Sequence, residues 1–240
     1  MRLPRPASLP PSGSRRHQPR STGRWKRTSL IVISTLALIA SVKPTAADVS
    51  ENAAQRIGGG NPVIGKEKSD AGRCQECHGA DGYSSDAKIP HHAGQYAGYL
   101  IKQLNNFQAG FRKHNIMTLM SEDLTAADIA DIAAYFASQK PMRGDGAVIN
   151  PLASNLFVNG DPARDIPACS SCHGDNGIGR VADNVFYPVI GGQRRVYLRS
   201  QLVNWKLGER NNSPDGIMNK IAKLLSDDEI NALADYISGL

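Results

Sequence analysis

Two copies of one short motif decide how this chain folds: Cys74-Gln75-Glu76-Cys77-His78 and Cys169-Ser170-Ser171-Cys172-His173. Together they use all four cysteines of the 240 residues, and a glycine follows each copy. Cys-x-x-Cys-His is the attachment signature of c-type haem, in which two thioethers hold the porphyrin and the histidine binds the iron. The sequence therefore predicts two covalently bound haem c groups, one at each motif.

A zinc site and a thiol redox pair are the other interpretations of paired cysteines. Zinc-binding pairs commonly lie roughly 15–20 residues apart, whereas these pairs begin at Cys74 and Cys169. Neither alternative explains why a histidine directly follows both pairs. Haem attachment accounts for every residue of the motif.

The first 47 residues are typical of an export signal. They hold nine Lys or Arg and no Asp or Glu, an apolar run at 30–40, and small residues before the first acid, Asp48. The apolar run, about 12 residues, is well short of the roughly 20 that a membrane-spanning helix needs. We therefore expect cleavage after Ala47 and a periplasmic location; a retained membrane anchor is the alternative.

The net charge depends on that segment. The full chain has 28 basic and 22 acidic residues and a net charge of +6. Without residues 1–47 it has 19 basic and 22 acidic residues and a net charge of −3. The basic excess thus belongs to the signal, so we expect no nucleic-acid binding.

The rest of the chain is a duplication. When the halves are aligned at their cysteines, the stretch 99–104 (Tyr-Leu-Ile-Lys-Gln-Leu) matches 197–202 (Tyr-Leu-Arg-Ser-Gln-Leu), and Gly94-Gln95 matches Gly192-Gln193. A Pro- and Gly-rich stretch separates the halves. We expect domains at 48–140 and 151–240, joined by a linker at 141–150.

Both halves show helical periodicity, so the predicted fold class is all-α. Apolar residues recur at helical spacing in 96–109 and 195–207, and a glycine closes each segment. The last helix of each half opens on a capping sequence, at Thr125 and at Ser226. A helix is also expected at 151–159. The segment before Cys74 is poorly marked, and no strand is predicted.

The repeat also selects a sixth iron ligand. Methionine is usual in electron-transfer haems because its thioether favours reduced iron. Met117 and Met218 each lie seven residues before a matching leucine, whereas Met120 has no counterpart. We therefore expect the irons to be bound by His78 with Met117 and by His173 with Met218.

Three other histidines compete for the first iron: His91, His92 and His114. His92 deserves notice because the second half has Ile190 in its place. A backbone carbonyl at Pro90 and at Pro188 is expected to accept a hydrogen bond from the proximal imidazole. A simple turn is the alternative role for these two prolines.

These features resemble the cytochrome c4 family, the dihaem class I cytochromes c of bacterial periplasms. The resemblance covers nearly all of residues 70–240 and rests on both Cys-x-x-Cys-His-Gly motifs, the Gly-Gln pairs, the repeated Tyr-Leu-x-x-Gln-Leu and the ends of both halves. It implies two tandem class I cytochrome c domains about a pseudo-twofold axis, His/Met ligation of each haem, and loose association with the membrane. The lead-in to Cys74 and the pair His91-His92 depart from the family pattern.

We therefore expect a periplasmic electron carrier with no catalytic residue. It would move single electrons between respiratory donors and an acceptor such as a terminal oxidase, and its partners would be redox proteins. The alternatives are a haem subunit of a dehydrogenase complex and a dihaem peroxidase-type enzyme. An enzyme of that kind needs an open sixth position, which a methionine in each half argues against.

Overall fold

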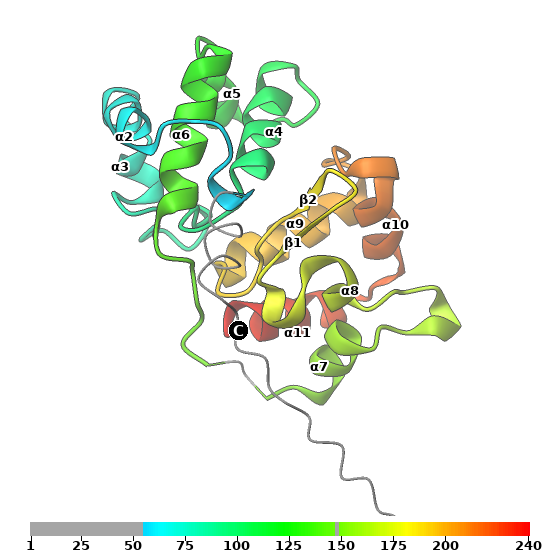
Figure 1. Cartoon of the computed structure of the whole chain (residues 1–240). Helices are drawn as coiled ribbons and strands as arrows, with labels where there is room; N and C mark the ends of the chain where they lie inside the picture. The colour runs from blue at the N-terminus through cyan, green and yellow to red at the C-terminus, as the bar shows by residue number, and fades with distance from the viewer. Residues whose placement is uncertain (1–54, 147–148) are drawn as a thin grey trace, which may run out of the picture. The chain divides into compact units, whose positions relative to one another are not determined.

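The computed structural model describes residues 55–146 and 149–240 (Figure 1). The predicted export signal and its cleavage point lie outside these residues. The first half contains α2 (Pro62–Ala71), α3 (Gln75–His78), α4 (Ala97–Gln108), α5 (Asn115–Ser121) and α6 (Ala126–Ser138). In the second half, α7 (Pro151–Val158), α8 (Cys169–His173), α9 (Arg195–Leu207), α10 (Ile217–Leu224) and α11 (Asp227–Ser238) follow the same order.

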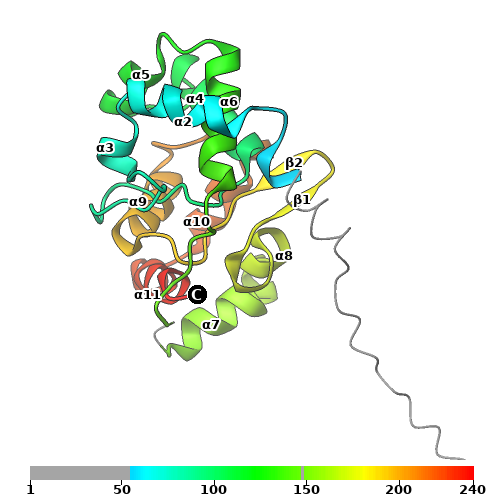
Figure 2. The same cartoon turned by 60° about the vertical axis from the view of Figure 1, so that its left-hand side comes forward.

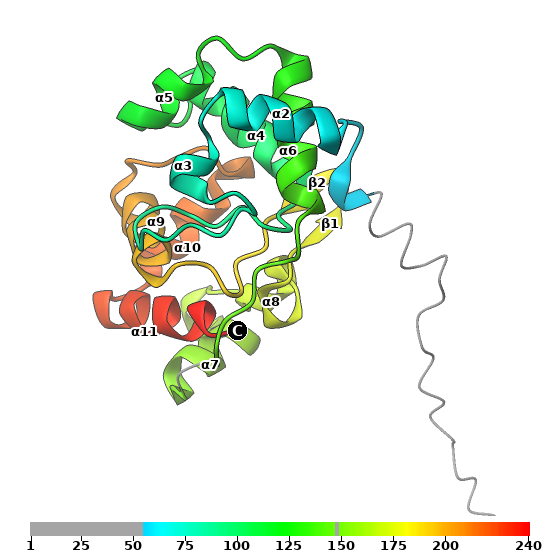
Figure 3. The same ribbon diagram turned by 90° about the vertical axis from the view of Figure 1, so that its left-hand side faces the viewer.

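The two halves match helix by helix in chain order. Figures 2 and 3 show the same helices from two further directions. The cysteine motifs form α3 and α8, and the long periodic segments form α4 and α9. Both final helices begin with a capping box, in which the Thr125 and Ser226 side chains accept from the backbone of Asp128 and Glu229. The mostly helical fold confirms the predicted class.

The helix before Cys74 is better defined than its sequence indicated. The side chain of Asn61 accepts hydrogen bonds from the backbone N–H groups of Val63 and Ile64, and Pro62 occupies the first turn. An asparagine cap followed by proline is a standard helix start. The helix packs closely on α6, because a Cβ at Gly65 would lie 1.9 Å from the Asp131 carbonyl oxygen.

Each half has its own apolar core. In the first, α4 and α6 bury one cluster of side chains: Ala97, Leu100, Ile132, Ala133, Tyr135, Phe136 and Ala137. In the second, α7, α9 and α11 bury a larger one that includes Leu156, Phe157, Leu198, Ile230, Leu233 and Ile237. These stripes follow the helical periodicity of the sequence.

The expectation of no strand was wrong. Strands β1 (Arg180–Ala182) and β2 (Val185–Tyr187) pair antiparallel, with Val181 opposite Phe186. Asp183 and Asn184 form the turn, both with positive φ, as two-residue hairpins require. The apolar runs on either side are only three residues long, so periodicity did not reveal them. The hairpin occupies the part of the second half where three extra residues precede Gly192.

The start of the segment between the halves is hydrogen-bonded to both of them. Met142 is only 4 % exposed, and its N–H donates to the Ala93 carbonyl. Gly144 N–H donates to the Leu240 carbonyl at 2.6 Å. Tyr96, Met142 and Val189 form a small apolar cluster that draws on both halves. The domain boundaries at 140 and 151 remain a prediction. Across the described residues, no helix has the length and apolar character needed to cross a membrane.

Candidate haem sites

Both cysteine motifs lie on a single helical turn. Cys74 caps α3, which ends at His78, and α8 runs from Cys169 to His173. Residues three and four apart share one face of a helix, so both cysteines and the histidine of each motif point to the same side. Gly79 ends the first turn with φ +82°, and a Cβ there would lie 2.2 Å from the Tyr83 carbonyl oxygen. The glycine after the motif is therefore required by space as well as conformation.

The histidine of each motif is held by a backbone carbonyl, as predicted. The distance from His78 Nδ1 to Pro90 O is 3.0 Å, and that from His173 Nδ1 to Pro188 O is also 3.0 Å. A carbonyl only accepts, so Nδ1 carries the proton and the Nε2 lone pair remains available. Burial lowers the pKa of both imidazoles, which favours the neutral form that binds a metal. This is the arrangement expected of an oriented iron ligand.

None of the four cysteines, all of which lie in the described residues, forms a disulfide. Burial raises the pKa of Cys74, and raises that of Cys169 to about 11. A redox-active thiol needs a lowered pKa. In residues 55–146 and 149–240 no three histidine, cysteine or carboxylate side chains gather where they could hold a metal ion. Within these ranges, the zinc and thiol-redox interpretations gain no support, and the residues present fit covalent haem.

The two expected methionines occupy equivalent helix starts. Met117 lies in the first turn of α5 and Met218 in the first turn of α10, and both are half-buried. The Met117 N–H donates to His114 Nδ1 at 3.3 Å, and the Met218 N–H donates to Ser213 Oγ at 3.2 Å. A side chain thus fixes the backbone at each methionine. Met120 is 41 % exposed and has no such support.

The competing histidines have other contacts. His114 caps α5, as described above. His91 is buried, and its Nδ1 accepts the Ser84 N–H at 2.9 Å; burial lowers its pKa to about 4. The ring of His92 stacks on that of His78, with centroids 4.0 Å apart.

A pair of arginines that was not predicted from the sequence lies where the halves meet. Arg112 and Arg210 each lie two residues after the matched glycines Gly110 and Gly208. Arg112 donates to Gln103 Oε1 (2.8 Å) and to the Tyr197 hydroxyl (3.0 Å). The repeated Gly-x-Arg was a usable signal for this pair.

Arg210 repeats those contacts with the halves exchanged. It donates to Gln201 Oε1 (2.6 Å) and to the Tyr99 hydroxyl (3.2 Å). The side chain of Lys102 lies nearby, and its pKa is lowered by burial and by the two guanidinium groups. Among the described residues, no carboxylate forms an ion pair with any of these three cations. Buried cations normally require an anion, so this junction is electrostatically incomplete by itself.

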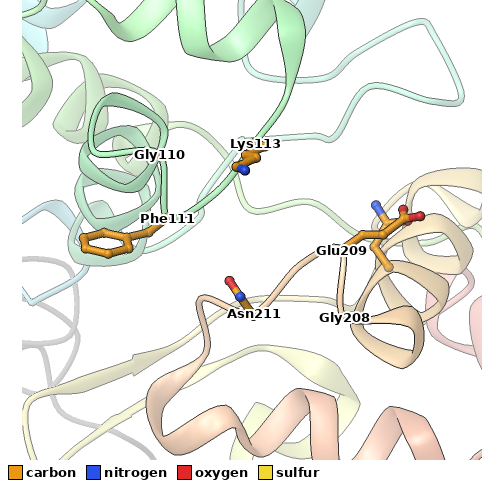
Figure 4. Close-up of a pocket in the computed structure, with 7 residues that line it drawn as sticks. Gly110, Phe111, Lys113, Gly208, Glu209 and Asn211 are labelled. Atoms are coloured by element: carbon orange, nitrogen blue, oxygen red, sulfur yellow. The ribbon is translucent and has the colours of Figure 1, made fainter.

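A cavity of about 610 Å³ opens beside this junction, between the loops that follow α4 and α9 (Figure 4). Phe111 and Lys113 line it from the first half, and Glu209 and Asn211 from the second. The side chains of Lys113, Glu209 and Asn211 are exposed, and Asn204, the fourth polar residue that lines the cavity, is half-buried. The cavity therefore contributes no buried polar group that would select a separate ligand.

Comparisons with known proteins agree with this geometry. Residues 158–240 match the family model described as "Cytochrome c". Cytochrome c4 from Pseudomonas aeruginosa is 41 % identical over 184 residues, which is 75 % of this chain and 89 % of that protein. A thiosulfate dehydrogenase electron acceptor from Stutzerimonas stutzeri is 35 % identical, covering 85 % of this chain and 91 % of the relative.

The crystal structure of reduced recombinant cytochrome c4 from Pseudomonas stutzeri matches with a TM-score of 0.69 and 37 % identity. The match covers 76 % of this chain and all of that one. Sequence and structure thus point to the same relatives. The chain belongs to the cytochrome c4 family of dihaem electron carriers, and it carries two covalently bound haem c groups.

Proposed function

We propose that His78 with Met117 binds the iron of haem 1, attached at Cys74 and Cys77, and that His173 with Met218 binds the iron of haem 2, attached at Cys169 and Cys172. The observation that carries this assignment is the pair of equal Nδ1-to-carbonyl contacts at 3.0 Å. These contacts leave both Nε2 atoms free to face an iron. The methionines are supported by their matched places at the starts of α5 and α10.

The protein's part in electron transfer is to hold and bury the two groups. When bound, haem supplies an iron that changes between two oxidation states. The Pro90 and Pro188 carbonyls would fix the orientation of the two histidine ligands, and the apolar cores would keep water away from the two haems. With a histidine and a methionine of the chain to hold each iron, neither site would leave room for a substrate. This agrees with the family, whose members are electron carriers and not enzymes.

The arginine junction has a role in the same proposal. Haem carries two propionates, and Arg112 with Arg210 would supply the positive charge that those carboxylates need. Each guanidinium contacts groups of both halves. The arginines would therefore connect the surroundings of the two haems.

Near-infrared spectra of the wild type and of methionine variants test the ligand assignment. The oxidised protein should show the weak near-infrared sulfur-to-iron band of His/Met haem, with an intensity that fits two sites. Met117→Ala should remove about half of it and Met218→Ala the other half, and each variant should gain carbon monoxide binding in the reduced state. Met120→Ala is the control and should leave the band unchanged. If Met120→Ala removed the band and Met117→Ala left it unchanged, the assignment would be overturned.

We also propose that the chain works in the periplasm after removal of residues 1–47, with a respiratory redox protein as donor and a terminal oxidase or similar acceptor. A second candidate donor is a thiosulfate dehydrogenase, because one relative is named as the electron acceptor of that enzyme. Stopped-flow reduction by a purified thiosulfate dehydrogenase would test it. Saturable, rapid reduction supports that donor, and reduction only by other respiratory proteins excludes it.

A further inference from the structure

Two glutamines, Gln95 and Gln193, connect each half to the haem site of the other. We propose that Gln193 positions the proximal ligand of haem 1 and that Gln95 positions that of haem 2, so that each half sets the reduction potential of the haem it does not carry. This inference rests on the proposed ligands His78 and His173. Both glutamines are buried, with 3 % and 5 % of their surfaces exposed.

The first contact runs from the second half to the first. The Oε1 atom of Gln193 accepts the His91 N–H at 2.8 Å, and its Nε2 donates to the His91 carbonyl at 2.9 Å. The amide thus clamps the backbone of the residue that directly follows Pro90. The Arg194 N–H donates to the same Oε1 at 2.9 Å and fixes the orientation of the side chain.

The mirrored contact runs from the first half to the second. The Oε1 atom of Gln95 accepts the Val189 N–H at 2.9 Å, and its Nε2 donates to the Val189 carbonyl at 2.8 Å. The Tyr96 N–H donates to this Oε1 at 3.1 Å. Val189 follows Pro188, whose carbonyl holds His173. The four distances from the two glutamine amides to the His91 and Val189 backbones agree within 0.1 Å.

One peptide group carries the coupling at each site. The Pro90 carbonyl and the His91 N–H belong to the same peptide unit, so that unit accepts from His78 and donates to Gln193. Hydrogen bonds in such a chain polarise and strengthen one another. Donation of the peptide N–H makes its carbonyl a stronger acceptor, and the imidazole then becomes more basic. A more basic ligand stabilises oxidised iron and lowers the potential.

The test is a crossed pair of substitutions in the complete holoprotein. Gln193→Met keeps the length of the side chain but removes the strong acceptor and the donor. It should change the equilibrium constant for one-electron reduction of haem 1 about threefold in favour of the reduced form. At 59 mV per tenfold, this raises the potential by about 28 mV. Gln95→Met should do the same to haem 2. NMR redox titration, with haem signals assigned through contacts to neighbouring residues, gives the two potentials separately.

Two further variants keep the result decisive. Gln193→Glu retains an acceptor for the His91 N–H, so it should fold. It should raise the potential of haem 1 less than Gln193→Met does, or should lower it. Gln139→Met is the matched control: the Nε2 of Gln139 donates to the Tyr135 carbonyl at 2.9 Å within the first half, so the same exchange removes a glutamine amide that does not reach the other half. It should leave the difference between the two potentials unchanged.

Several results would overturn the inference. These are a shift at the haem of the substituted half, equal shifts at both haems, or no shift in any glutamine variant. The near-infrared band is recorded on the same samples. Its absence in the wild type would show that the ligand assignment had failed, whereas an intact band with an uncrossed pattern would reject the glutamine coupling alone.

Discussion

The histidines of the two haem motifs make the same hydrogen bond to a backbone carbonyl, but a different side chain lies beside each of them. In the first half the ring of His92 stacks on His78 and contacts Phe136 edge-on, with centroids 5.5 Å apart. In the second half Ile190 takes that place and packs against the apolar core. A polar ring beside the ligand favours oxidised iron more than an aliphatic side chain does. We therefore expect that the same kinds of ligand serve both haems and that the residues beside these ligands separate the two reduction potentials.

The strongest test of the comparison is to remove one haem. We expect the double variant Cys74→Ser/Cys77→Ser to lose haem 1 and keep haem 2, and Cys169→Ser/Cys172→Ser to do the reverse, because each motif supplies both thioethers for its own porphyrin. Intact mass spectrometry counts the groups that remain. If either variant lost both haems, the halves would not be independent attachment sites.

Exchanging the neighbours should reduce the difference between the haems. His92→Ile should raise the potential of haem 1, and Ile190→His should lower that of haem 2, each by an amount near tenfold in the equilibrium constant, about 59 mV. Spectroelectrochemical titration measures both. An unchanged separation in His92→Ile would show that this ring does not influence the iron.

The capping boxes offer a smaller comparison. Ser226→Ala should cost more than Thr125→Ala, because Glu229 is buried whereas Asp128 is half-buried. Both carboxylates also form an ion pair, Glu229 with Arg164 at 2.5 Å and Asp128 with Lys68 at 2.8 Å. We expect losses of about 2 and about 1 kcal/mol in the free energy of unfolding. Chemical denaturation of the holoproteins provides the values, and a larger loss in Thr125→Ala would contradict this ranking.

The smallest expected effect is the acid dependence of the first capping box. Hydrogen bonds from Lys68, and then from Thr125, lower the pKa of Asp128 from 3.8 to about 2. Its ionised form therefore stabilises the fold above pH 4, and this contribution is lost as the pH falls towards 2. Asp128→Asn should be less stable than the wild type at pH 7 and nearly equal to it at pH 2. A difference that did not change with pH would argue against this role.

Much of this molecule could be predicted from local sequence. Three features could be predicted because each depends on residues close in the chain or on the repeat. They are the haem motifs, the capped final helices and the carbonyls at Pro90 and Pro188. The hairpin at 180–187 was missed because strands of three residues carry almost no periodicity. The cap at Asn61 was overlooked although its sequence was informative.

The contacts between the halves could not be predicted in the same way. The matched glutamines were visible as conserved positions of the internal repeat. Their partners, however, are backbone atoms of His91 and Val189, whose side chains differ. Main-chain partners leave no trace in residue type, so only the structure could identify them.

The reciprocal glutamine contacts are those of an isologous interface, in which one residue meets the partner's loop and the partner's copy returns the contact. Such interfaces are the ordinary means by which identical subunits form dimers. Joining the two copies in one chain makes their association intramolecular, so dilution does not separate them. It also frees each copy to change alone. In a homodimer a substitution occurs twice by symmetry, but here a histidine could arise at position 92 while isoleucine stayed at position 190, so the residues around the two haems can differ within one carrier.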